Sequence, residues 1–220
     1  MHFWTWQPRQ NHSFHGVTTR KWLFLIFCGL FALSSLGCTV TSQYMTTLPA
    51  SQSIVVDPAA ATVVFLRPSG YAGSVKHIIM DQNGRFLGEN WGWTYFAVKM
   101  PPGQYTFVAW SEGTPALQAV VEAGKVYYVE VSIVMGGWSP RSRLFALGPR
   151  AEHWNELPAW LARSEMLVPN EASGQAELAE RGAETNVVVA KGLRNWANYD
   201  AEARDKRSLT PADGLSVPVR

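Results

Sequence analysis

The sequence predicts a mainly β fold, an antiparallel β-sandwich followed by a C-terminal helical tail. From residue 62 to about 147, short β-branched and aromatic runs alternate with turn residues at nearly regular spacing. After Pro149 helix-forming residues dominate. The chain has 220 residues, 47% of them hydrophobic, which suits one domain with appendages.

Seven or eight strands are expected, most of them separated by glycine, proline or asparagine turns. Their ranges are 62–67, 75–81, 85–88, 94–100, 104–110, 116–121, 125–134 and 143–147. Asn83-Gly84 predicts a type I′ hairpin with a tight register. Pro101-Pro102-Gly103 and the glycine of Glu122-Ala123-Gly124-Lys125 predict corners between strands. The range 62–67 is apolar on both faces, which predicts a central strand covered by an element after Pro149.

Two helices are expected in the tail. In residues 152–166 apolar residues recur at helical spacing, with Pro158 at a kink or in the first turn. A second helix is expected from an Asn170 or Ser173 cap to about Arg207, with weak points at Gly182 and Gly192. Residues 209–214 then predict a capped single turn. The second helix carries an apolar stripe of Val189, Leu193 and Trp196.

The N-terminal segment has the layout of a signal peptide. Residues 22–37 carry no charge and follow Arg20-Lys21. A membrane-spanning helix needs about 20 apolar residues, so an uncleaved anchor is the less favoured alternative. The ending 33–38, Leu-Ser-Ser-Leu-Gly-Cys, resembles the lipobox of bacterial lipoproteins, although Ser35 stands where a large aliphatic residue is usual.

The lipobox resemblance implies that Cys38 is diacylated and becomes the new N-terminus. Thr39 at the following position implies sorting to the outer membrane, with the protein facing the periplasm. The expected organisation is a signal peptide over 1–37, a flexible tether over 38–61, a β-sandwich over 62–148 and a helical extension over 149–220.

Several motifs in the expected sandwich occur together. They are Val64-Phe65-Leu66-Arg67-Pro68, Thr94-Tyr95-Phe96, Pro101-Pro102-Gly103-Gln104-Tyr105 and Gly124-Lys125 before Tyr127-Tyr128. As a set they resemble the bacterial lipoproteins grouped under domain of unknown function 2846. The resemblance implies a sandwich of the transthyretin or carboxypeptidase-regulatory kind, and it implies no activity, because that family has none assigned.

Charge and residue usage exclude several function classes. Beyond Cys38 the chain holds 16 basic and 17 acidic residues with no basic run, which disfavours a nucleic-acid partner. After cleavage Cys38 is the one cysteine, so no disulfide is expected. His77 and His153 form no metal-binding pattern, and we interpret them as a strand histidine and a helix-start histidine. Neither a metal nor a cofactor is expected.

Catalysis finds little support. The sequence contains no nucleophile elbow, zincin helix, Walker loop or dinucleotide fingerprint. Two carboxylate pairs remain, Asp81 with Glu89 and Glu112 with Glu122, and we interpret all four as solvated strand ends. A hydrolase is therefore a remote option, and the chain is not expected to be an enzyme.

Aromatic residues at 91–95 leave two hypotheses open. Strand alternation places Trp91, Trp93 and Tyr95 on one side, where Trp138 and Trp110 would extend an exposed stacking platform. The alternative is that the stripe of the second tail helix covers Trp91 and Trp93. The favoured function is a non-catalytic, lipid-anchored envelope protein that binds a protein partner or serves as a scaffold. The alternative function is a carbohydrate- or peptidoglycan-binding module that uses the platform.

Overall fold

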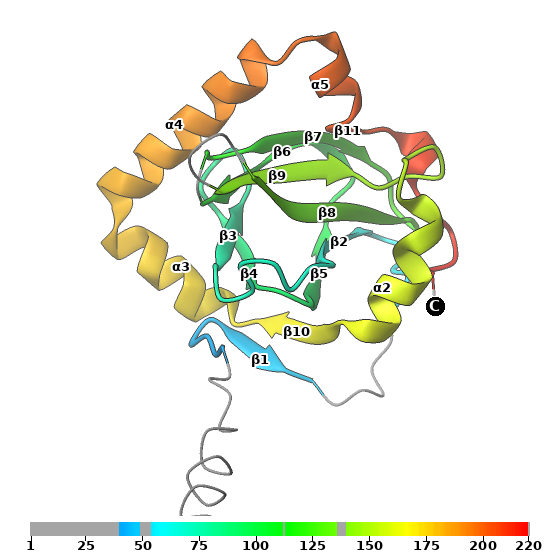
Figure 1. Ribbon diagram of the computed structural model, residues 1–220, viewed down its shortest axis with the longest axis horizontal. Helices are drawn as coiled ribbons and strands as arrows, with labels where there is room; N and C mark the ends of the chain where they lie inside the picture. The colour runs from blue at the N-terminus through cyan, green and yellow to red at the C-terminus, as the bar shows by residue number, and fades with distance from the viewer. Residues whose placement is uncertain (1–39, 49–53, 112, 136–139, 220) are drawn as a thin grey trace, which may run out of the picture. The chain divides into compact units, whose positions relative to one another are not determined.

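Two β-sheets packed together form the core of the computed structural model, which describes residues 40–48, 54–111, 113–135 and 140–219 (Figure 1). The six-stranded sheet has the order β1 (Met45–Thr47), β10 (Glu165–Pro169), β5 (Thr94–Met100), β2 (Ala61–Arg67), β8 (Val126–Met135) and β9 (Pro140–Ala146). The five-stranded sheet has the order β11 (Ser208–Leu209), β7 (Ala116–Val121), β6 (Gly103–Trp110), β3 (His77–Met80) and β4 (Phe86–Asn90).

The mainly β class and the C-terminal helices are confirmed, whereas the purely antiparallel arrangement is wrong. Three strand pairs are parallel, namely β2 with β8, β5 with β10 and β7 with β11. In each pair a long connection separates the two strands along the chain, and parallel pairing requires such a connection. The fold is therefore a sandwich-like pair of mixed sheets.

All eight expected strand ranges contain strands, and three further strands come from segments with no strand prediction. β1 lies in the expected tether and pairs with β10, while Ile54 is buried in a hydrophobic cluster. β10 and β11 lie in the expected helical extension; β10 pairs between β1 and β5, and β11 forms an edge of the five-stranded sheet. The described residues from Val40 onward therefore form one unit, without a division at residue 148.

The central strand β2 is buried on both faces, as predicted. Toward the second sheet, Phe65 stacks on Phe96 and meets Phe107 edge to face, at centroid distances of 5.2 and 5.1 Å. On the opposite face Val64 and Leu66 belong to a second hydrophobic cluster. The cover is the short helix α2 (Leu157–Arg163), which buries Leu157 and Leu161 there and holds its proline in the first turn.

The corners at Pro101-Pro102-Gly103 and Gly124 are confirmed. Each carries the chain from one sheet to the other, from β5 to β6 and from β7 to β8, and Gly124 has φ +72°. The type I′ prediction at Asn83-Gly84 is wrong. Such a turn needs a positive φ at both residues, and only Gly84 has one, +76°. The Gly84 N–H donates to the Asp81 carbonyl, and the β3–β4 register shifts at Met80. A turn closed by a left-handed glycine commonly carries such a bulge.

The long second helix is divided into α3 (Glu171–Glu180), α4 (Gly182–Asn198) and α5 (Ala201–Asp205). Asn170 caps α3, as predicted, and its side chain accepts from the Ser173 N–H at 3.2 Å. The break at Gly182 lets α3 contact β4 while α4 lies along β6 and β7, so the helices follow the edge of the molecule (Figure 1).

Two shorter tail elements complete the fold. The 3₁₀ helix η1 (Trp154–Glu156) precedes α2, and η2 (Pro211–Asp213) begins with the predicted capping box of Thr210 and Asp213. Among the described residues, no helix is long and apolar enough to cross a membrane.

Candidate functional site

Trp91 belongs to the hydrophobic core. Its side chain is 8% exposed and lies in the same cluster as Phe96, between the sheets. The Trp91 N–H donates to the Thr94 hydroxyl at 3.0 Å, and the Lys76 ammonium lies 5.9 Å from the indole centroid. Trp91 therefore offers no open face for stacking on a ligand.

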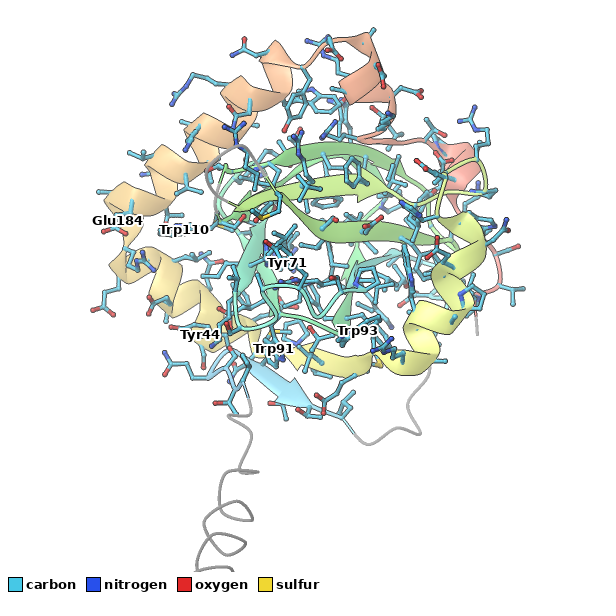
Figure 2. The ribbon with its side chains drawn as sticks, in the orientation of Figure 1. Tyr44, Tyr71, Trp91, Trp93, Trp110 and Glu184 are labelled. Atoms are coloured by element: carbon cyan, nitrogen blue, oxygen red, sulfur yellow. The ribbon has the colours of Figure 1, made fainter. Side chains whose placement is uncertain are left out.

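Trp91, Trp93 and Tyr95 do not share one side as expected, because Trp91 and Tyr95 pack in different hydrophobic clusters (Figure 2 labels Trp91 and Trp93). Trp93 has φ +58°, which interrupts the extended backbone just before β5 begins. The half-buried Trp93 ring is covered by the Arg163 guanidinium at 3.8 Å from its centroid. Tyr95 is half-buried against the cluster under α2. The three residues form no common platform.

The tail stripe covers the core in part, through Val189, but α4 is not placed over Trp91 and Trp93. α4 lies over β6 and β7, because buried Gly192 lets the helix approach Val108 closely. Trp196 meets Tyr199 edge to face at 6.0 Å. Next to α4, Arg181 lies 4.1 Å from the centroid of Trp110 (Figure 2). Cys38 and Trp138, the other predicted site residues, lie outside the described residues.

Of the four acids interpreted as solvated strand ends, exposed Glu122 directly after β7 fits the interpretation, whereas Asp81 and Glu89 do not. Asp81 and Glu89 are both buried. Asp81 Oδ1 accepts from the N–H groups of Asn83 and Arg85 at 2.8 and 3.1 Å, which gives it a structural role in the turn. Glu89 lies 3.5 Å from the Lys76 ammonium. Glu122 pairs with Lys125 at 2.8 Å on the surface, and Glu112 lies outside the described residues.

His77 and His153 occupy a strand and a helix start, as predicted. His77 Nε2 lies 2.8 Å from the Ser142 hydroxyl, which links β3 to β9 across the two sheets. Burial lowers the pKa of His77 to about 3, with the charge of Arg67 acting in the same direction, so the ring is neutral near pH 7. His77 therefore acts as a neutral hydrogen-bonding group of the core.

A buried arginine holds the loop after β2. One terminal nitrogen of Arg67 donates to the carbonyls of Tyr71 and Ala72 at 2.9 and 2.7 Å, and the other donates to the Val75 carbonyl. Burial lowers the pKa of Arg67 to about 10, so the guanidinium keeps its charge at neutral pH. Its hydrogen bonds are structural, since they replace water at three loop carbonyls.

The site that sequence analysis missed is a hollow of about 580 Å³ beside β8 and β9, which we name the Glu130 hollow. Its wall comes from β8, the end of β9, the segment before η1, and the chain from α5 to η2. Its ionisable lining residues are Glu130, Arg150, Glu152, His153, Asp205, Lys206 and Asp213. Four of them are acidic and two permanently basic, so acids are in surplus.

Glu130 is buried at the floor of the hollow, and its side chain hydrogen-bonds with Ser132 two residues along the same strand. It lies on β8 between Leu66 of β2 and Phe145 of β9 and is 8% exposed. Among the described residues none forms an ion pair with it. Burial raises the pKa of Glu130, and the neighbouring charge of His153 opposes that shift in part.

Three other residues of the hollow, His153, Ser208 and Asp213, make local side-chain contacts. His153 Nδ1 lies 3.0 Å from Glu156 Oε1, and this partner raises the pKa of His153. Asp213 accepts from the Thr210 N–H and hydroxyl at 2.8 and 2.7 Å, and a side chain on Gly148 would overlap it. The Ser208 hydroxyl donates to the Arg204 carbonyl at 2.7 Å.

The chemistry of the hollow favours a ligand with hydrogen-bond donors or positive charge. A carboxylate that has lost its hydration is stabilised most by a ligand that donates hydrogen bonds to it. Among the described residues, no group of three histidine, cysteine or acidic side chains is placed to hold a metal ion.

A signal for this site was present in the sequence. Tyr128 and Glu130 alternate with the core residues Tyr127 and Val129, so they lie on the outer face of β8. An outer face beside the apolar outer face of β2 needs a cover, and Trp154 meets Tyr128 edge to face at 6.4 Å there. The sequence signal was therefore an acid on a strand face that needs a cover, and it did not show which segments form the hollow.

No family model, curated protein or solved structure matches the chain.

Proposed function

We propose that this protein is a non-catalytic, lipid-anchored protein of the bacterial envelope, whose sandwich is a binding module. The observation that carries the proposal is the 16-residue uncharged run that ends at Gly37-Cys38, just before the chain enters the folded unit at Val40. A run of this length and ending fits export and lipidation better than a membrane span.

The anchor places the protein at a membrane surface. In the lipobox resemblance Cys38 carries two or more acyl chains, which together give stable attachment. Thr39 favours the outer membrane and the periplasmic side. The family resemblance to domain of unknown function 2846 stays part of this proposal, and the corners at Pro101-Pro102-Gly103 and Gly124 are consistent with its sandwich.

The Glu130 hollow is the proposed ligand site of the module. Binding is favoured over catalysis because both hydroxyls of the hollow make local structural contacts. The Ser208 hydroxyl donates to the Arg204 carbonyl, and the Asp213 carboxylate that accepts from the Thr210 hydroxyl also accepts from the Thr210 N–H in the cap of η2. The carbohydrate alternative has less support, since Trp91 is buried and Arg163 covers Trp93.

The test compares two cysteine variants of the full chain. Cys38→Ala should abolish incorporation of a labelled fatty acid and leave the protein unprocessed or released from membranes. Cys28→Ala is the matched control, because it removes a thiol inside the uncharged run and leaves the predicted acylation site intact. A Cys38→Ala variant that is labelled and fractionates like the parent would overturn the proposal.

A further inference from the structure

Three large apolar side chains are exposed around the loop after β2. Tyr71 is 49% exposed and Met135, at the end of β8, is 66% exposed. The Tyr71 hydroxyl contacts the Met135 sulfur, so the two residues adjoin although they are far apart in sequence. Val75 is the third exposed residue and lies in the same loop as Tyr71. We name Tyr71, Val75 and Met135 the apolar patch.

The loop that presents this patch is held in place. Arg67 donates to the carbonyls of Tyr71, Ala72 and Val75, and these bonds are largely shielded from water. The Gly92 N–H also donates to the Gly73 carbonyl at 3.0 Å. A loop fixed from within cannot turn its apolar side chains inward, so their exposure is part of the folded structure.

The patch adjoins the start of the folded chain. The Lys76 ammonium, next to Val75, donates to the Thr41 carbonyl at 2.6 Å. Thr41 is three residues after Cys38, and three residues of extended chain span at most about 11 Å. An acylated Cys38 therefore brings a membrane within reach of Tyr71 and Val75.

An exposed cationic side chain flanks the patch. Arg141 pairs with Val134, the neighbour of Met135, whereas the Lys76 ammonium beside Val75 is held by Glu89 and the Thr41 carbonyl. Tyrosine, with an apolar ring and a polar hydroxyl, is suited to the boundary between acyl chains and water. Lysine and arginine place their charge at headgroup level while their stems cover apolar surface. The patch thus has the composition of a membrane-contact surface.

We propose that the apolar patch rests in the membrane to which Cys38 is attached, so that the anchor and the patch together orient the domain. The inference rests on the proposed lipid anchor. The occupant is lipid, because the proposed acylated residue lies just before Thr41 and the patch combines exposed apolar side chains with the exposed cation of Arg141.

The experiment uses the full lipoprotein in vesicles that contain brominated lipids, which quench nearby fluorophores. Tyr71→Cys carries an environment-sensitive fluorophore, and Met135→Cys is a second position in case the first variant folds poorly. Val187→Cys is the matched control, because Val187 is 64% exposed on α4 and lies outside the patch. Because acylated Cys38 has no free thiol, the fluorophore reacts only with the cysteine introduced in each variant.

Quenching several-fold stronger at residues 71 and 135 than at 187 is the expected result. Vesicle flotation of the same samples reports on the anchor separately. Flotation with equal quenching at all positions would overturn the patch proposal alone, whereas absence of flotation would overturn the proposed function and the patch with it. Quenching of the fluorophores by one another, without quenching by the brominated lipids, would show that a second copy of the chain covers the patch. That result would also overturn the proposal.

Discussion

Arg67 and Glu130 are both buried charged residues of the six-stranded sheet, yet their surroundings differ. Arg67 is 1% exposed and donates to three loop carbonyls. Glu130 is 8% exposed, faces a hollow of about 580 Å³ and has no ion-pair partner among the described residues. Burial alone therefore does not distinguish a charge held by loop carbonyls from one that faces a hollow.

We infer from this difference that the role of a buried charged side chain depends on whether protein groups satisfy its hydrogen bonds. A buried charge whose partners are all protein groups stabilises a local structure and has nothing left to offer a ligand. A buried charge beside an open hollow bears a desolvation cost in the free protein, which a ligand with suitable donors would relieve. The predictions below separate these two cases.

Removal of the Arg67 charge should have the largest effect. Arg67→Met leaves the carbonyls of residues 71, 72 and 75 without their donors, and we expect a loss of about 4 to 5 kcal/mol in the free energy of unfolding. Urea unfolding measures it. Arg85→Met, which breaks a surface pair with Glu171, should cost less than about 1 kcal/mol. Equal effects in the two variants would contradict a structural role for Arg67.

The two tryptophans should differ in the same assay. Trp91→Ala removes a core side chain and should cost about 3 to 4 kcal/mol. Trp93→Ala loses the contact with Arg163 in a half-buried position, and about 1 to 2 kcal/mol is expected. The carbohydrate-binding alternative would gain support from a different result. In that case the wild type would bind glycan, and both variants would lose this binding while they keep the stability of the wild type.

His77 should make stability depend on pH. Its folded pKa of about 3 lies below the usual value of 6.5, so the unfolded chain binds more protons between these limits. Stability from this group is fully present above pH 6.5 and falls by about 1.4 kcal/mol per unit as the pH drops toward 3.

The variant His77→Gln should flatten the curve of unfolding free energy against pH between 6.5 and 4. His153→Gln, at an exposed position, should leave that slope in place. An unchanged slope in His77→Gln would show that other groups govern the acid sensitivity.

Glu130→Gln should have the smallest effect on stability, and its sign should be opposite to that of Arg67→Met. Because the pKa of Glu130 is raised, its protonated form is favoured in the fold, and stability is lost as pH rises through the folded pKa. At pH 7 the variant should be as stable as the wild type or more stable, by about 1 kcal/mol or less. A loss above about 2 kcal/mol would show that Glu130 is a structural charge like Arg67.

The sequence predicted the strands well and the site poorly, for physical reasons. Alternation and turn residues mark each of the eight expected strands, and the two-sided apolar pattern of β2 predicted its cover by α2. β1, β10 and β11 have no such pattern, since they are short strands at or next to a sheet edge, and their pairing depends on long-range contacts.

The site depends on backbone detail that residue types do not carry. The positive φ of Trp93 separates it from Trp91, and no rule of alternation anticipates that angle. Glu130 resembles an ordinary outer-face acid until the segment before η1 and the turn at η2 close around it. Pairing and burial from distant segments thus created the site.

The mass of the N-terminal peptide of the mature protein tests the account most directly. We predict a chain that begins at Cys38 and carries acyl groups on that residue, with no peptide from residues 1–37. A mature chain that begins elsewhere, or an unmodified thiol at Cys38, would contradict the lipid anchor on which the proposed function and the membrane contact both rest.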